Sequence, residues 1–130
     1  MLLSSMNNVV NVFDFAPMTG GVPQIGQGLT DDTEAIQAAV DSFQNHLIYV
    51  DSTSSTVTAY SCPILYFPPG KYKVSDKIVF DDYHSAIKII GDNAIIHSDG
   101  EFEDYAFYHS RCYDVRVEGL NFFNFKKALY

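Results

Sequence analysis

The sequence predicts a mainly β protein in which a capping helix is followed by a solenoid of short stacked strands. From Pro63 onward, short apolar runs of β type recur with turn residues between them and without a further helical period. The segment AIKIIGDNAII also aligns with DVRVEGLNFF without a gap, so that Ile87 falls on Val115. Repeats of about 20 to 30 residues that are built from strands and turns are typical of a β-solenoid.

Composition and charge fit one globular domain with an acidic surface. The chain has 130 residues, of which 47% are hydrophobic, and its formal net charge is -8. All eight Lys and Arg residues lie from Lys71 onward, so the first half offers no basic groove to a nucleic acid. The N-terminal MLLSSMNNVV has no cationic region and too short an apolar run for a Sec signal peptide or a membrane span. We therefore expect neither nucleic acid nor membrane as a partner.

The first elements are a strand and a loop. VVNVFDF, over 9–15, alternates apolar and polar residues and predicts a strand. The stretch 16–29 holds four glycines and two prolines, which predict a loop without a regular element. Farther along, HLIYV over 46–50 predicts a strand, and DSTSSTVTAYS predicts a polar connector.

The clearest local pattern is an amphipathic helix within TDDTEAIQAAVDSF. Asp31, followed three residues later by Glu34, forms a capping box, for which we expect a structural role at the N-terminus of the helix. One face of the helix is apolar and consists of Ile36, Ala39, Val40 and Phe43. A helix in front of the first coil would cover its open end and block edge-to-edge pairing.

The repeat divides the chain into two parts of one continuous domain. Residues 1–62 are predicted as the N-terminal strand, loop and capping helix, and residues 63–130 as the first coils. The same alignment places Gly91 on Gly119 and the segment KIVF (77–80) on YAFY (105–108). A weaker copy of the repeat places LYF (65–67) on IKI (87–89).

Two cations share one position of the repeat. Lys88 aligns with Arg116, in strands that are otherwise apolar at alternate positions, so both side chains are predicted to point outward in one column. Such a column could bind a sugar carboxylate or pair with nearby acids. We favour pairing with nearby acids.

Five blocks in this order resemble the N-terminal part of the pectate-lyase-like superfamily, in the rhamnogalacturonase and epimerase-like branch that includes many bacteriophage tailspikes. The blocks are NVFDF, GLTDDTEAIQAAVDS, LYFPPGKYKVS, IKIIGDNAII and VRVEGLNFF. The resemblance implies a right-handed parallel β-helix, here of about three coils, with an N-terminal amphipathic capping helix. It also implies polysaccharide as the partner, as for a tailspike depolymerase, a homotrimer, and a location in the virion tail or outside the cell. In this superfamily the catalytic acids lie on later coils, so the resemblance assigns no catalytic residue here.

Acidic and aromatic residues of the coil region are the candidates for contact with carbohydrate. Paired carboxylates serve glycoside hydrolysis, and clustered oxygens also suit Ca²⁺, although we favour solvated loop acids and no cofactor. The two cysteines lack the spacing of a zinc site, so we expect no metal centre. Tyrosine rings pack on sugars, but stacking inside the solenoid is the alternative that we favour. The candidates are Asp81, Asp82, Tyr83, Glu101, Tyr105 and Tyr108.

The sequence is consistent with two functions. In the first, the chain is the cap and the opening coils of a carbohydrate-binding or polysaccharide-degrading β-helix protein. In the second, it is a complete, non-catalytic structural or adhesive module of a larger assembly such as a virion tail. In both, the last coil carries a strand edge with Phe122, Phe123 and Phe125, which further coils, other copies or other subunits would cover.

Overall fold

In the computed structural model the fold consists mainly of two parallel β-sheets. Within the described residues the larger sheet has six strands and the smaller sheet has three. The predicted mainly β class is confirmed, and no described helix is long and apolar enough to cross a membrane. The described residues are 9–42, 50–51, 56–57, 64–80, 87–98, 105–109, 115–123, 125 and 127–129.

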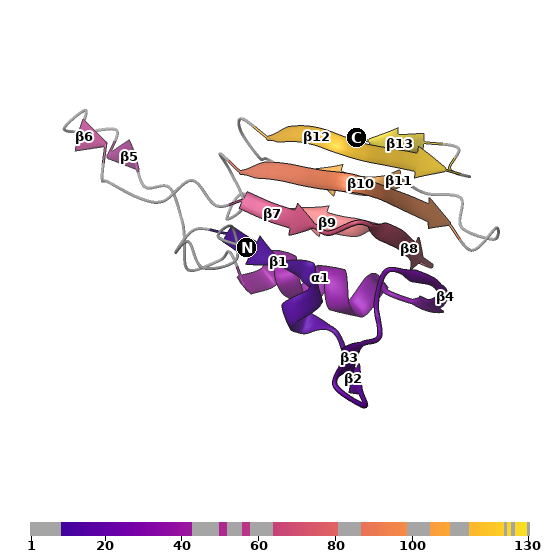
Figure 1. The fold of residues 1–130 in the computed structure, drawn as a ribbon. Helices are drawn as coiled ribbons and strands as arrows, with labels where there is room; N and C mark the ends of the chain where they lie inside the picture. The colour runs from indigo at the N-terminus through magenta and orange to yellow at the C-terminus, as the bar shows by residue number, and fades with distance from the viewer. Residues whose placement is uncertain are drawn as a thin grey trace.

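The larger sheet is a stack of parallel rungs (Figure 1). The long strand β10 (Lys88–Ser98) pairs along its first half with β7 (Ile64–Phe67) and along its second half with β8 (Gly70–Val74). On its other side β10 pairs with β12 (Arg116–Phe123). Below β7 and β8 lie the short strands β1 (Val9–Asn11) and β4 (Gln27–Asp31).

The smaller sheet repeats the same order of strands along the chain. It contains β9 (Ile78–Phe80), β11 (Tyr105–His109) and β13 (Lys127–Leu129), all paired in parallel. Each of these strands follows a rung of the larger sheet, because β8, β10 and β12 precede them in turn. Parallel neighbours that come from successive turns of the chain are the arrangement that the repeat predicts.

The interior is formed by alternate residues of the two sheets. Along β10 the burial pattern switches with every residue except at the bend near Gly91, as expected for a strand with one face in the core. The aromatic part of the core centres on Phe107, whose ring lies 6.3 Å from Phe67, 5.5 Å from Phe80 and 5.3 Å from Phe122. Tyr72 is also buried, and its hydroxyl donates to the carbonyl of Pro68 at 2.6 Å.

Helix α1 (Thr33–Asp41) covers one end of this stack, opposite β12 (Figure 1). Ile36, Ala39 and Val40 are buried, which confirms three members of the predicted apolar face, whereas Phe43 lies outside the described residues. The N-cap is Asp32 and not Asp31, so the helix begins one residue later than the capping box with Glu34 predicts. The reason is that Asp31 is the last residue of β4 and pairs with Lys73 of β8.

The side chain of Gln37 closes the exposed edge of the smaller sheet. Its Nε2 donates to the carbonyl of Val79 at 3.0 Å, and its Oε1 accepts from the Val79 N–H at 2.9 Å. The side-chain amide thus satisfies both backbone groups of an edge strand, as a neighbouring strand would do. No local pattern in the sequence singles out Gln37, because its partner lies in a distant strand.

Replacing Gln37 by Ala is expected to lower the free energy of unfolding by about 1–3 kcal/mol, because two backbone hydrogen bonds at the edge of β9 are lost. Urea unfolding followed by circular dichroism measures this change. The matched control is Gln27→Ala, since Gln27 donates a single exposed hydrogen bond, to the carbonyl of Pro23. Equal destabilisation by the two substitutions would show that the hydrogen bonds between Gln37 of α1 and the edge of β9 do not stabilise the fold.

Two predicted local elements are wrong in part. The strand predicted over 9–15 ends at Asn11, and Val12–Phe15 forms the 3₁₀-helix η2, because the side-chain oxygen of Asn11 accepts from the Phe13 N–H at 2.9 Å. The region predicted as an irregular loop, 16–29, contains the first three residues of β4 and an antiparallel hairpin of β2 (Met18–Thr19) and β3 (Val22–Pro23). Both turn residues of the hairpin are glycines with positive φ, which is the conformation of a type I′ turn.

The predicted alignment between β10 and β12 holds for only part of these strands. Residues 88–90 pair with 116–118, as the gapless alignment predicts. Farther along, Ala94 pairs with Leu120 and not with the predicted Phe122, because the register shifts at a bulge in between.

The other two predicted alignments are wrong in register. Between β9 and β11, Ile78 pairs with Phe107 and not with Ala106, and between β7 and β10 the partner of Leu65 is Ile89. The aligned strands are nevertheless neighbours in each case, so the repeat predicts which strands pair. The exact register depends on the loops and bends between them, which vary from coil to coil.

A small antiparallel pair lies in the predicted polar connector. It consists of β5 (Val50–Asp51) and β6 (Thr56–Val57). Val50 is the last residue of HLIYV, and the remainder of that predicted strand lies outside the described residues. The strand predicted over 46–50 is therefore tested only at its end.

Candidate functional site

The structure describes two of the six predicted carbohydrate contacts. Tyr105 and Tyr108 both lie on β11, and both are half-buried. The other four candidates, Asp81, Asp82, Tyr83 and Glu101, lie outside the described residues, so their placement stays a prediction. The candidate carbohydrate site therefore consists of residues of β11 and of the segments next to it.

Tyr105 and Tyr108 form a pair next to a lysine. Their ring centroids are 6.3 Å apart and their planes are tilted by 47°. The Lys77 Nζ lies 5.9 Å from the centroid of the Tyr108 ring, within the range of a cation–π interaction. Lys77 directly precedes β9, and the pairing of β9 with β11 brings it to the tyrosines, a contact that no local sequence pattern indicates. We call Lys77, Tyr105 and Tyr108 the tyrosine surface.

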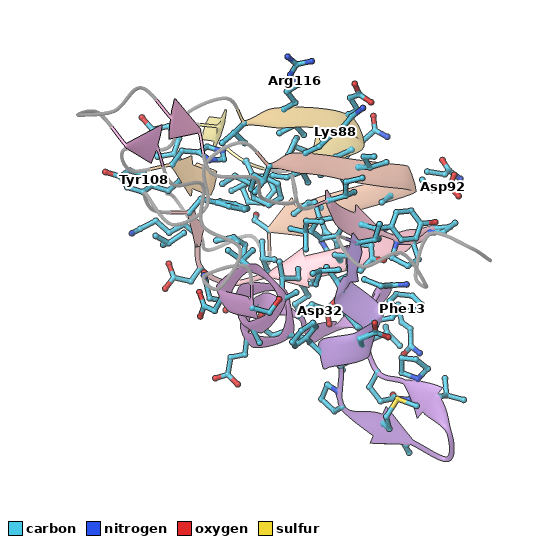
Figure 2. All side chains as sticks on the ribbon, turned by 90° about the vertical axis from the view of Figure 1, so that its left-hand side faces the viewer. Phe13, Asp32, Lys88, Asp92, Tyr108 and Arg116 are labelled. Atoms are coloured by element: carbon cyan, nitrogen blue, oxygen red, sulfur yellow. The ribbon has the colours of Figure 1, made fainter. Side chains whose placement is uncertain are left out.

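The orientation of β11 explains why Tyr108 does not join the aromatic core. Phe107 is fully buried and pairs with the buried Ile78, whereas Tyr108 is half-buried and pairs with the half-buried Val79, and its side chain lies at the outside of the sheets (Figure 2). Tyr72, which is not among the candidates, is the tyrosine that is fully buried in the described core, and the alternative of stacking inside the solenoid stays a prediction for the candidates. A tyrosine ring beside an ammonium group offers an apolar face for sugar C–H groups and a donor for sugar oxygens.

A second surface consists of cations on the outer face of the larger sheet. Lys88 and Arg116 pair directly across β10 and β12, which confirms their predicted shared column (Figure 2). The Lys88 Nζ lies 3.4 Å from the Glu118 Oε2, so the predicted pairing with a nearby acid is also confirmed for Lys88. Such an exposed pair contributes at most about 1 kcal/mol.

The outer face of the larger sheet is cationic although the protein is acidic. The strands of this sheet carry four cations, Lys71, Lys73, Lys88 and Arg116, and three acids, Asp31, Asp92 and Glu118. Asp92 accepts a long hydrogen bond of 3.5 Å from the Tyr66 hydroxyl, and burial together with this carboxylate raises the pKa of Tyr66. We call the four cations the cationic face.

Asp31 and Asp32 hold the capped end of the stack together, as expected for a structural role. The buried Asp32 accepts from the Gly26 N–H at 3.0 Å and from the Thr30 hydroxyl at 3.1 Å, and burial raises its pKa. Asp31 accepts from the hydroxyls of Thr33 and Ser75. Partial burial opposes ionisation of Asp31, but these hydrogen bonds and the nearby Lys73 outweigh it and keep the pKa below its ordinary value.

The two described histidines of the coil region are packed rather than clustered. The His109 ring stacks on Phe80 with centroids 4.8 Å apart, and burial lowers its pKa. The His97 Nδ1 lies 3.2 Å from the carbonyl oxygen of Ser98. Within the described part of the chain, no group of three His, Cys, Asp or Glu side chains is placed to hold a metal ion. Calcium at Asp81, Asp82 and Glu101, which lie outside the described residues, stays a prediction.

Comparisons with known proteins agree with this class of fold, a stack of parallel strands capped by a helix and consistent with a fragment of a parallel β-helix. The family model described as rhamnogalacturonase A/epimerase, pectate lyase-like, matches residues 22–127. The chain therefore belongs to this pectate lyase-like family.

One solved structure with a significant similarity is ORF18 of Geobacillus virus E2. Its sequence is 25% identical, the TM-score is 0.54, and the match covers 91% of this chain. The match covers 25% of the viral protein, so the present chain spans about a quarter of that protein's length. No curated protein matches the chain.

Proposed function

We propose that the chain forms the capped end and about three opening coils of a right-handed parallel β-helix in a tailspike-like phage protein that binds polysaccharide. Membership of the pectate lyase-like family and the similarity to a viral protein support this proposal. The alternation of strands between the two sheets supports the coil arrangement, and the position of α1 supports the capped end. A phage tail protein of this kind is located in the virion.

The observation that carries the binding role is the tyrosine surface on β11. Two half-buried tyrosines and a lysine are held together by the pairing of β9 with β11, so their arrangement needs little ordering on binding. Asp81, Asp82, Tyr83 and Glu101, which lie outside the described residues, belong to the same proposal as additional contacts. Calcium bound by these acids would be an accessory ligand.

Binding without cleavage is the activity that we propose for these residues alone. Within the part of the chain that the structure describes, the acids whose pKa values are shifted, Asp31 and Asp32, are committed to hydrogen bonds at the capped end. If the whole protein is a lyase or a glycoside hydrolase, its catalytic acids belong to later coils. Incubation with polygalacturonate, rhamnogalacturonan and bacterial capsular polysaccharides, followed by assays for reducing ends and unsaturated products, tests this point.

The replacement of Tyr108 by Ala is expected to weaken polysaccharide binding about tenfold or more, because the ring presents the apolar face of the site. The measurement is binding of the chain to an array of the same polysaccharides, followed by titration against the best ligand. Lys77→Ala should weaken binding less, since it removes only the ammonium group.

The matched control is Tyr66→Ala, which removes a tyrosine of the larger sheet. Unchanged binding by the Tyr108 variant would contradict the assignment of the tyrosine surface. Loss of binding in a Lys88→Ala, Arg116→Ala double variant alone, together with strong dependence on salt, would move the site to the cationic face.

The alternative function is a non-catalytic structural or adhesive module, and one observation favours it. The outermost strand β12 exposes 68% of Phe123, beside the edge that is not paired with β10. An apolar residue at a strand edge is suited to burial against another chain. We propose a homotrimer as the assembly and, separately, that further coils or subunits of another protein cover the edge of β12.

A further inference from the structure

The hairpin of β2 and β3 is an arm that extends from the capped end of the molecule. It projects beyond α1, away from both sheets (Figure 1). Its base is fixed because the Gln24 N–H donates to the carbonyl of Pro17 at 2.7 Å. At its tip, a Cβ added to Gly20 or Gly21 would meet no atom within 4 Å. The arm, residues 16–24, is thus an ordered element with open space around its tip.

Both faces of the arm carry exposed apolar side chains. Met18 pairs with Pro23, and Val22 pairs with Thr19, so Met18 and Val22 lie on opposite faces of the hairpin. Met18 is 58% exposed and Val22 is 50% exposed. Of the five large apolar residues that the described chain exposes, four lie between Phe15 and Leu29. This concentration is typical of an interaction surface.

Charge indicates which partner suits the arm. Residues 15–30 contain no charged side chain, whereas the rest of the capped end, within 9–42, carries five carboxylates and no cation. The whole chain has a net charge of -8, so copies of it repel one another. The arm is the exposed part of this end that can meet the same part of another copy without opposing like charges.

We propose that the arms of neighbouring copies pack against one another around a rotation axis at the capped end. An arm with two apolar faces leaves one face exposed in a two-fold pair, whereas in a ring of three or more copies each arm touches two others. This inference rests on the self-association in the proposed function and locates it at the end opposite β12. The packing of preformed hairpins costs little conformational entropy.

Light scattering and sedimentation of the chain over a dilution series test the inference. The wild type is expected to have a mass of at least three chains, and high salt should not weaken the assembly, because the contact is neutral and salt screens the repulsion between the acidic chains. The Met18→Asp, Val22→Asp double variant is expected to weaken self-association more than tenfold and to give single chains. Circular dichroism checks that the sheets remain, and polysaccharide binding at saturating ligand checks the proposed function separately.

Two controls separate the arm from other contacts. Met18→Leu with Val22→Ile keeps both faces apolar and should retain the wild-type mass. Phe123→Asp places the same charge at the opposite end and should also retain it. A wild type that is monomeric or dimeric at all concentrations overturns the inference, and so does an Asp double variant with unchanged mass. Loss of assembly by Phe123→Asp alone would overturn it in favour of the edge of β12.

Discussion

Replacing Phe107 by Ala is expected to lower the free energy of unfolding by about 3–5 kcal/mol. Phe107 is fully buried where the two sheets meet, and its ring contacts Phe67, Phe80 and Phe122 from three different strands. Its removal leaves a cavity between rungs that a stack of parallel strands cannot easily close. A loss of this size is a large part of the stability of a typical domain. Urea unfolding, followed by far-ultraviolet circular dichroism, measures it.

The control for this prediction is the same substitution at an exposed position. Phe123→Ala removes an identical ring that is 68% exposed, and we expect a change within about 0.5 kcal/mol. Phe107→Leu, which keeps most of the volume, should cost less than about 1.5 kcal/mol. Similar losses for the two alanine variants would mean that the core does not centre on Phe107.

The sequence predicts those parts of the fold in which local pattern and packing agree. The apolar face of α1 is predicted because Ile36, Ala39 and Val40 follow the helical period and are all buried. Lys88 and Arg116 are correctly placed in one column because their strands pair without interruption at that end. The alignment fails beyond the bulge because similarity between repeats carries no information on a shift in register. The hairpin is missed because its Gly-Gly turn lies in a region that is rich in other turn residues.

The site is harder to predict than the fold because it depends on pairing between distant strands. Tyr105 and Tyr108 can be selected as aromatic candidates, but Lys77 joins them only through the register between β9 and β11. Gln37 bonds Val79 for a similar reason, since α1 and β9 meet only in the folded chain. The buried role of Asp32 depends on the backbone of a glycine in the preceding loop, whose position no periodicity indicates.

Gly119 is the position at which a methyl group is expected to damage the stack of rungs most directly. It has a φ of 74°, and a Cβ built on it would overlap the carbonyl oxygen of Gly91 in the neighbouring rung. Gly119→Ala therefore combines an unfavourable backbone conformation, which costs about 1–2 kcal/mol, with a displacement of β12 from β10. The displacement adds a further ~1–3 kcal/mol, as overpacking does elsewhere. Thermal and urea unfolding of the variant measure the sum.

Gly20→Ala separates these two contributions, because Gly20 also has a positive φ, of 58°, but has no atom within 4 Å of an added Cβ. This variant should show only the conformational cost, so the difference between the two variants reports the contact between Gly91 and Gly119. If both variants lower the free energy of unfolding equally, β10 and β12 are not in close contact at Gly91 and Gly119. A larger loss for Gly119→Ala supports the view that a glycine in each rung lets β10 and β12 bend together.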